Sequence, residues 1–178
     1  MEWNILENSK TQFVGRFDIF RDKDTIYKKN KKNSLGNHLI SQLNNSTNYI
    51  LYKNIIENIN ILPYIGKHII KGYDVEKDGS YKSPYIKGYR LDQIENIDYL
   101  IFKKIKIQIK TLQKNLNKYN ELNILGGDWA LHNLLYSIND NIIYNVDLEG
   151  FFSYQSLPNF ASIDKINKWF NNILESNE

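Results

Sequence analysis

The strongest constraint on the fold is a regular stripe of apolar residues in the second half of the chain. Its members are separated by 4, 4, 4, 3 and 4 residues: Ile97, Ile101, Ile105, Ile109, Leu112 and Leu116. This spacing returns to one face of an α-helix, so it predicts a helix of about twenty residues. Most of the neighbouring lysines fall off the stripe and are expected to face solvent: Lys103, Lys104, Lys106, Lys110 and Lys114.

The first third of the chain has a different pattern. The segment QFVGRFDIFRDKDTIYKK contains three short β-rich pieces separated by polar residues. We expect antiparallel strands at Gln12–Arg16, Phe17–Arg21 and Thr25–Lys29, with a tight turn at Asp22–Asp24. From Ser34 to Asn58 the spacing of Leu and Ile becomes helical.

Two further hairpins are predicted. The first pairs Ile69–Val75 with Tyr81–Ile86 around Lys77-Asp78-Gly79, and the chain leaves it in a bend at Lys87-Gly88. The second pairs Leu134–Ser137 with Ile142–Val146.

A final amphipathic helix is predicted at Ile163–Leu174. Strands therefore gather early and helices late, which favours an α+β fold in two lobes over an alternating βαβ fold. We place the first lobe, a small antiparallel sheet with a helical insertion, at residues 1–88. A reduced, mainly helical lobe follows at residues 89–178.

Composition excludes several classes of site. The 178 residues contain no Cys, which excludes disulfides, thiolate metal sites and cysteine nucleophiles and fits a cytoplasmic protein. The polar start MEWNILENSK has no apolar signal core, and we expect no membrane span. A net charge of +3 is too small to indicate nucleic-acid binding by itself. The lysines at 28, 29, 31 and 32 are open between a solvated turn and an anion-binding patch.

The segment GGDWALHNLLYSINDNIIYNVDLEGF, which starts at Gly126, is rich in oxygen-bearing side chains around the second hairpin. Asn133 precedes the first strand and Asp147 follows the second, so both should emerge at the same end. Asp128 lies one compact loop before Asn133. A carboxylate and an amide oxygen suit Mg²⁺, which takes few protein ligands beside substrate phosphates. A further carboxylate could accept a proton from a hydroxyl group.

This segment resembles the catalytic core of the protein-kinase-like superfamily. Asp128-Trp-Ala-Leu-His-Asn133 matches the D-x-x-x-x-N catalytic loop of that family, and Asp147-Leu-Glu-Gly150 is similar to its metal-binding D-x-G, one residue longer. The resemblance implies that Asp128 is the catalytic base and that Asn133 and Asp147 hold Mg²⁺ beside ATP. It covers about residues 12 to 152 in architecture.

The resemblance also implies roles in the first lobe. The third strand of such a sheet supplies a lysine to the ATP phosphates, and we prefer Lys28 to Lys29. A helix after it supplies an orienting carboxylate, for which Glu57 is the candidate. Ser83–Gly88 resembles the hinge between lobes, where backbone groups near Tyr85 and Ile86 would meet adenine.

The chain departs from the family pattern in several places. Phe13-Val-Gly15-Arg-Phe has one Gly where a Gly-rich phosphate loop is usual. Few residues follow Asp147, too few for a protein-kinase activation segment and substrate platform. Asp-x-Glu stands in place of Asp-Phe-Gly, and this motif resembles that of aminoglycoside and choline kinases and of sugar kinases of lipopolysaccharide assembly. Glu149 would then reach a second metal, or alternatively form a salt bridge with a lysine.

These features favour an ATP-dependent phosphotransferase acting on a hydroxyl of a small molecule or glycan. The alternative is a kinase-like protein that binds nucleotide or a partner without catalysis, because the phosphate loop is missing. His132 is open between a compensating donor and a packing role. The aromatics of Phe151–Phe160 are open between stacking on a sugar and covering the core. A homodimer also stays open, because a short second lobe leaves apolar surface for a second copy.

Overall fold

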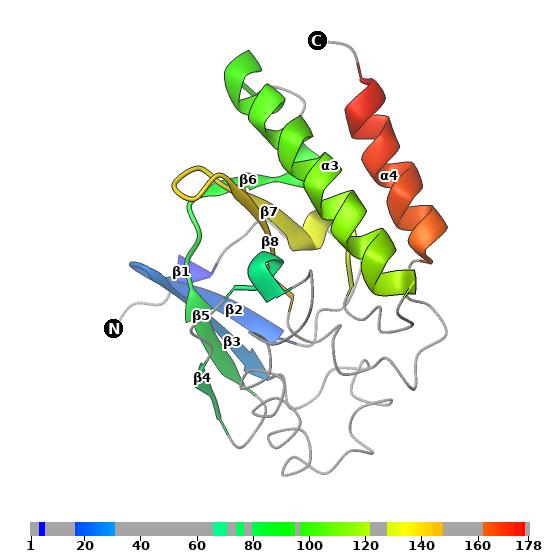
Figure 1. Ribbon diagram of the computed structural model, residues 1–178. Helices are drawn as coiled ribbons and strands as arrows, with labels where there is room; N and C mark the ends of the chain where they lie inside the picture. The colour runs from blue at the N-terminus through cyan, green and yellow to red at the C-terminus, as the bar shows by residue number, and fades with distance from the viewer. Residues whose placement is uncertain are drawn as a thin grey trace. The chain divides into compact units, whose positions relative to one another are not determined.

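The computed structural model describes residues 4–5, 17–30, 66–70, 74–76, 80–94, 97–121, 128–147 and 162–176. This part of the chain forms two small antiparallel sheets and two α-helices (Figure 1), so the predicted α+β class is confirmed. The chain divides into two compact units. The first consists of Met1–Asn58 and Lys71–Tyr85, and the second of Ile59–Ile70 and Ile86–Glu178.

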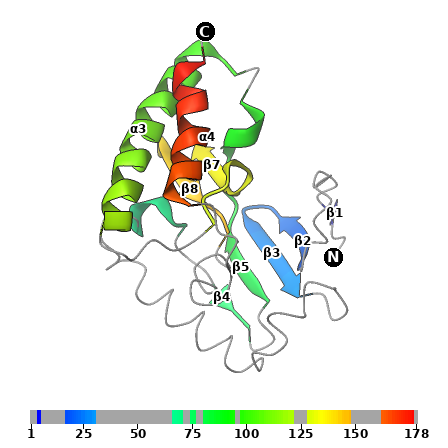
Figure 2. The ribbon, with the colours of Figure 1, turned by 90° about the vertical axis from the view of Figure 1, so that its right-hand side faces the viewer.

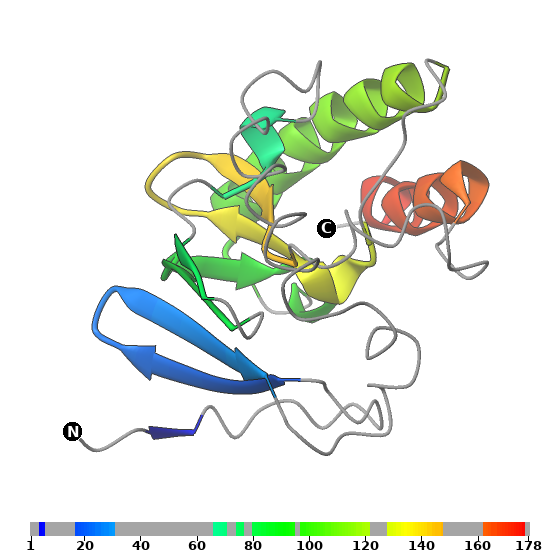
Figure 3. The same cartoon turned by 90° about the horizontal axis from the view of Figure 1, so that it is seen from below.

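The first unit contains a five-stranded sheet in the order β1-β2-β3-β5-β4. Its strands are β1 (Asn4–Ile5), β2 (Phe17–Asp22), β3 (Thr25–Asn30), β4 (Asp74–Val75) and β5 (Tyr81–Pro84). The hairpin of β2 and β3 (Figure 3) agrees with the prediction to within one residue at each strand end. Lys23 in its tight turn has a φ of 50°.

The predicted strand at Ile69–Val75 is wrong in its first part. Of the described residues in this range, only Asp74–Val75 pairs with β5, and the return strand ends at Pro84 rather than at Ile86. Ile69 belongs to the second unit, where it forms an isolated parallel bridge with Asn145. Ile69 and Ile70 are both buried there. Their apolar side chains serve a different core from the one that the β pattern suggested.

Several predicted elements lie outside the described residues. They are the strand at Gln12–Arg16, the helical segment at Ser34–Asn58 with Glu57, the residue Glu149 and the aromatic segment Phe151–Phe160.

The sheet of the second unit has the order β6-β7-β8. Strands β7 (Leu134–Ser137) and β8 (Ile142–Asn145) form the hairpin that the sequence predicted. The third strand, β6 (Gly88–Arg90), replaces the predicted bend at Lys87-Gly88. A Cβ atom on Gly88 would fall on the carbonyl oxygen of Tyr136, so glycine allows this close pairing.

Two helices lie side by side in the second unit (Figure 2): α3 (Tyr99–Glu121) and α4 (Ile163–Glu175). Helix α4 matches its predicted range to one residue and is capped by Ser162, whose Oγ accepts a hydrogen bond from the N–H of Lys165 at 3.3 Å. Three α4 side chains are buried: Ile166, Phe170 and Ile173.

Helix α3 buries most of the predicted stripe and extends beyond it. Its buried residues are Ile105, Ile109, Leu112, Leu116 and Tyr119. Ile97 precedes the helix, because Oδ1 of Asp98 accepts hydrogen bonds from the N–H groups of Leu100 and Ile101 and so caps its start. Four of the five lysines are exposed as predicted, but Lys106 is half-buried and donates to the carbonyl of Ser176 at 2.7 Å.

Candidate active site

The β7–β8 hairpin brings three predicted site residues together at one end. Leu134 at the start of β7 pairs with Asn145 at the end of β8. One residue further out, the N–H of Val146 donates to the carbonyl of Asn133 at 2.9 Å. Asn133 and Asp147 therefore flank the same end of the hairpin.

A buried side chain, Asn145, ties Asp128 to this end. Its Nδ2 donates to the carbonyl of Asp128 at 2.9 Å, and its Oδ1 accepts from the N–H of Asp147 at 2.9 Å. Asn145 is 0% exposed. A buried amide needs hydrogen-bond partners for both of its polar ends, and here Asp128 and Asp147 supply them. Asn145 was not predicted from the sequence. A polar residue on the same strand face as buried Ile143 was the available signal.

Hydrogen bonds also orient Asn133 and Asp128. Nδ2 of Asn133 donates to the carbonyl of Asp128 at 3.4 Å, which leaves the amide oxygen as the group that can bind a cation. Oδ1 of Asp128 accepts from the N–H of Ala130 at 3.1 Å. Trp129 between them is fully buried. The Asp128 carboxylate is thereby held on a short, anchored loop.

A second buried polar group, His68, supports the hairpin from η2 (Gly66–His68). Its Nδ1 lies 2.9 Å from the carbonyl of Ile143, and its Nε2 lies 3.0 Å from Nδ2 of Asn115. This arrangement suits a neutral ring that donates through Nδ1 and accepts through Nε2. The pKa of His68 is lowered from 6.5 to about 4, mainly by burial and to a smaller extent by the charge of nearby Lys67, although the hydrogen bond to Ile143 opposes the shift. This role of His68 was not predicted from the sequence.

The donor set fits a hard cation that keeps most of its water. One carboxylate, from Asp147, and one amide oxygen, from Asn133, are the kinds of ligand that Mg²⁺ takes beside substrate phosphates. Within the described ranges, no group of three or more His, Asp or Glu side chains could hold a metal ion by itself. Glu149, the third predicted ligand, lies outside those ranges.

Asp128 lines a cavity of about 400 Å³ in the second unit. The other lining residues are Asp92, Ala130, Leu131, His132, Lys165 and Trp169. His132 is exposed, so the packing role considered from the sequence is wrong. Its side chain lines the same cavity as Asp128. A hydroxyl compound in this cavity would have access to the proposed base.

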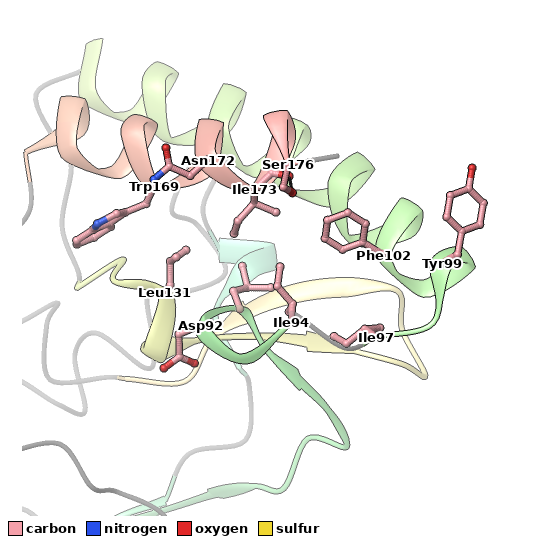
Figure 4. Close-up of a pocket in the computed structure, with 11 residues that line it drawn as sticks. Asp92, Ile94, Ile97, Tyr99, Phe102, Leu131, Trp169, Asn172, Ile173 and Ser176 are labelled. Carbon is pink, nitrogen blue, oxygen red and sulfur yellow. Dashed lines mark hydrogen bonds between the residues drawn. The ribbon is translucent and has the colours of Figure 1, made fainter. Parts of the chain in front are cut away.

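A larger cavity of about 650 Å³ lies next to this one, between α4 and the segment that leads into α3 (Figure 4). Asp92, Leu131 and Trp169 line both cavities, so the two cavities are direct neighbours. The larger cavity is lined mainly by apolar side chains, including Phe102 and Ile173. Of the residues that line the two cavities, only Asp128 and His132 were given a possible functional role from the sequence.

In the first unit, Lys28 and Lys29 line a separate cavity of about 390 Å³. Lys28 is half-buried and pairs across the sheet with the buried Tyr81, and its Nζ lies 5.3 Å from the centre of the Tyr81 ring. Lys29 is exposed. Lys28 is therefore the more constrained of the two candidate lysines.

The predicted adenine-binding residues, Tyr85 and Ile86, fall on either side of the boundary between the units. The N–H of Tyr85 donates to the carbonyl of Asp24 at 2.7 Å. The guanidinium of Arg21 lies 3.4 Å from the centre of the Tyr85 ring. An adenine ring bound at this position would therefore have to form hydrogen bonds with groups other than the Tyr85 N–H.

Comparison with models of known protein families gives no match for this chain, and comparison with curated proteins gives none either. Neither described helix is apolar enough over a sufficient length to cross a membrane.

Proposed function

We propose that this protein is an ATP-dependent phosphotransferase with a protein-kinase-like two-lobed fold and a hydroxyl group as acceptor. One observation carries the proposal: Asn145 and the hairpin backbone hold Asp128, Asn133 and Asp147 at one end of β7 and β8. Phosphoryl transfer is catalysed mainly by positioning and by neutralising charge, and these residue types can supply both.

In the proposed reaction, the acceptor hydroxyl enters the cavity beside Asp128. The Asp128 carboxylate accepts the hydroxyl proton while the hydroxyl oxygen bonds to the γ-phosphorus of ATP. The bond from the γ-phosphorus to the bridging oxygen breaks, which releases ADP and leaves the phosphate on the acceptor. Asn133 and Asp147 would hold Mg²⁺, which neutralises charge on the phosphoryl oxygens when it is bound.

Each unit has its own role in the proposed reaction. Lys28 of the first unit would contact the ATP phosphates, with Glu57 as its orienting partner. Asn133, Asp147 and Glu149 of the second unit would serve the metal. Neither Asn133 nor Asp147 lines the cavity beside Asp128, which supports an arrangement with the acceptor on one side of the base and the metal on the other.

The test is transfer of labelled γ-phosphate from ATP to a panel of hydroxylated metabolites and glycan precursors. Asp128→Asn removes the base with little change in shape, so we expect transfer to fall about 100- to 10,000-fold. Asp164→Asn is the matched control, since this exposed carboxylate lines neither cavity. Transfer by Asp128→Asn at the wild-type rate would remove Asp128 from the mechanism.

The alternative, nucleotide or partner binding without catalysis, predicts a different pattern. The wild-type protein would then bind ATP without transferring phosphate to any member of the panel. Asp128→Asn would leave that binding unchanged.

A further inference from the structure

The cavity of about 650 Å³ has a size typical of small-molecule sites, which span roughly 300 to 1,000 Å³. Its floor is buried core, since Leu91, Ile94 and Ile173 are 1%, 9% and 7% exposed. Trp169 stands on one side and Phe102 on the other (Figure 4). This shape is concave and suits a compact group better than the flat face of another protein.

The chemistry of the lining selects an uncharged group. Among the residues that the structure describes, no Lys, Arg or His lines the cavity, and the polar members are Asp92, Tyr99, Asn172 and Ser176. The Asp92 carboxylate is already paired with Arg90 through two hydrogen bonds, of 3.0 and 2.6 Å. A charged ligand group would therefore lose its hydration without gaining an opposite charge.

The smaller cavity beside Asp128 has the opposite character. It presents the side chains of His132 and Lys165 together with two carboxylates. The Lys165 Nζ lies 5.2 Å from the centre of the Trp169 ring, so this aromatic wall marks the change from polar to apolar lining. The three shared lining residues place the two cavities side by side, within the reach of one molecule.

We propose that the acceptor is an amphiphile, with a hydroxyl-bearing polar part beside Asp128 and an aromatic or aliphatic group in the larger cavity. This inference rests on the proposed phosphotransferase function, and it makes Trp169 and its neighbours the residues that determine specificity. Burial of the apolar group supplies affinity that a bare sugar or polyol lacks.

The experiment compares matched probes: the methyl and 4-nitrophenyl glycosides of glucose, galactose and mannose. Binding to the full chain is measured by calorimetry without ATP or Mg²⁺. We expect the nitrophenyl member of at least one pair to bind tenfold or more tightly than its methyl partner. Equal binding within every pair, or no binding of any nitrophenyl glycoside, would overturn the inference.

Two variants of α4 locate the effect. Asn172→Trp places a large ring in the cavity and should abolish the advantage of the nitrophenyl probe. Asn171→Trp makes the same change at a neighbouring exposed position that does not line the cavity, and the advantage should stay. A nitrophenyl advantage that survives Asn172→Trp would contradict this location.

A second pair keeps the test decisive if either tryptophan variant unfolds. Tyr99 lines the cavity and is 51% exposed, whereas Leu100 does not line it and is 64% exposed. Tyr99→Ser should weaken nitrophenyl binding at least threefold, and Leu100→Ser should leave it unchanged. Equal effects of the two changes would count against the proposed site.

Transfer assays separate this inference from the proposed function. If nitrophenyl glycosides bind in the cavity but no hydroxyl compound receives labelled phosphate, the phosphotransferase proposal fails and the apolar site stands. If phosphate is transferred with the same KM to methyl and nitrophenyl acceptors, the enzyme stands and the amphiphilic acceptor is wrong.

Discussion

Asn145 shows how one buried amide can organise a site made of other residues. Its side chain has no exposed surface and forms hydrogen bonds with both the carbonyl of Asp128 and the N–H of Asp147. A buried polar group must be paired, and here both partners belong to the residues proposed for chemistry. Asn145 is therefore a positioning residue for both ends of the site.

Replacing Asn145 should cost stability. Asn145→Ala removes two buried hydrogen bonds and leaves a small cavity, so we expect the free energy of unfolding to fall by about 2 to 4 kcal/mol. Urea titration measures the change. Asn139→Ala, in the exposed turn between β7 and β8, should change it by less than about 0.5 kcal/mol. Equal unfolding midpoints for the two variants would contradict the network.

His68 should make the stability of the protein depend on pH. In the unfolded chain this histidine binds a proton below pH 6.5, but in the folded protein its pKa is about 4. Because the unfolded state binds more protons between these values, stability rises with pH there and is lost as pH falls. The shift is worth about 3 kcal/mol between pH 7 and 4.

The check is urea unfolding at several pH values for wild type and His68→Gln. Glutamine does not titrate, so the variant should have a flatter dependence on pH between 4 and 6.5. Carboxylates elsewhere contribute equally to both proteins and cancel in the difference. Parallel curves would show that His68 does not remain neutral in the fold.

At the scale of elements, β6 depends on a close approach that only glycine allows. A side chain at Gly88 would meet the carbonyl oxygen of Tyr136 in β7 and lie 2.7 Å from Cδ2 of Leu135. The strand therefore forms where the sequence, read for turn residues, suggested a bend.

We predict that Gly88→Ala destabilises the protein by about 1 to 3 kcal/mol, because β6 must shift away from β7. Thermal unfolding followed by circular dichroism measures this loss. Lys87→Ala, at the exposed neighbouring position, is the control and should unfold near the wild-type temperature. An unchanged melting temperature for Gly88→Ala would argue against the paired strand.

At the scale of the whole molecule, nucleotide binding should stabilise the folded protein. A ligand at 100 times its dissociation constant adds about 2.7 kcal/mol, which raises the melting temperature of a chain of this size by roughly 5 to 10 °C. Lys28→Met should abolish the rise seen with ATP and Mg²⁺. Lys29→Met should keep it, since Lys29 is the exposed member of the pair. The reverse result would exchange their roles.

Residue patterns along the chain predicted the local elements well. The separations of Ile and Leu indicated α3, and turn residues between apolar runs indicated the β2–β3 and β7–β8 hairpins. These elements were predictable because their signals are periodic and their partners are near in sequence. The same short-range reasoning placed Asn133 and Asp147 at one end of a hairpin.

By itself, then, the sequence determined the α+β class, the main helices and the oxygen-rich hairpin end. Tertiary structure decided that Ile69 and His68 support β8, that Asn145 joins Asp128 to Asp147, and that Trp169 lines the cavity beside Asp128. Each of these relations joins residues distant along the chain or depends on which side of a strand is buried. Periodicity within one segment indicates neither which distant residue a side chain contacts nor which side of a strand is buried, because long-range packing determines both.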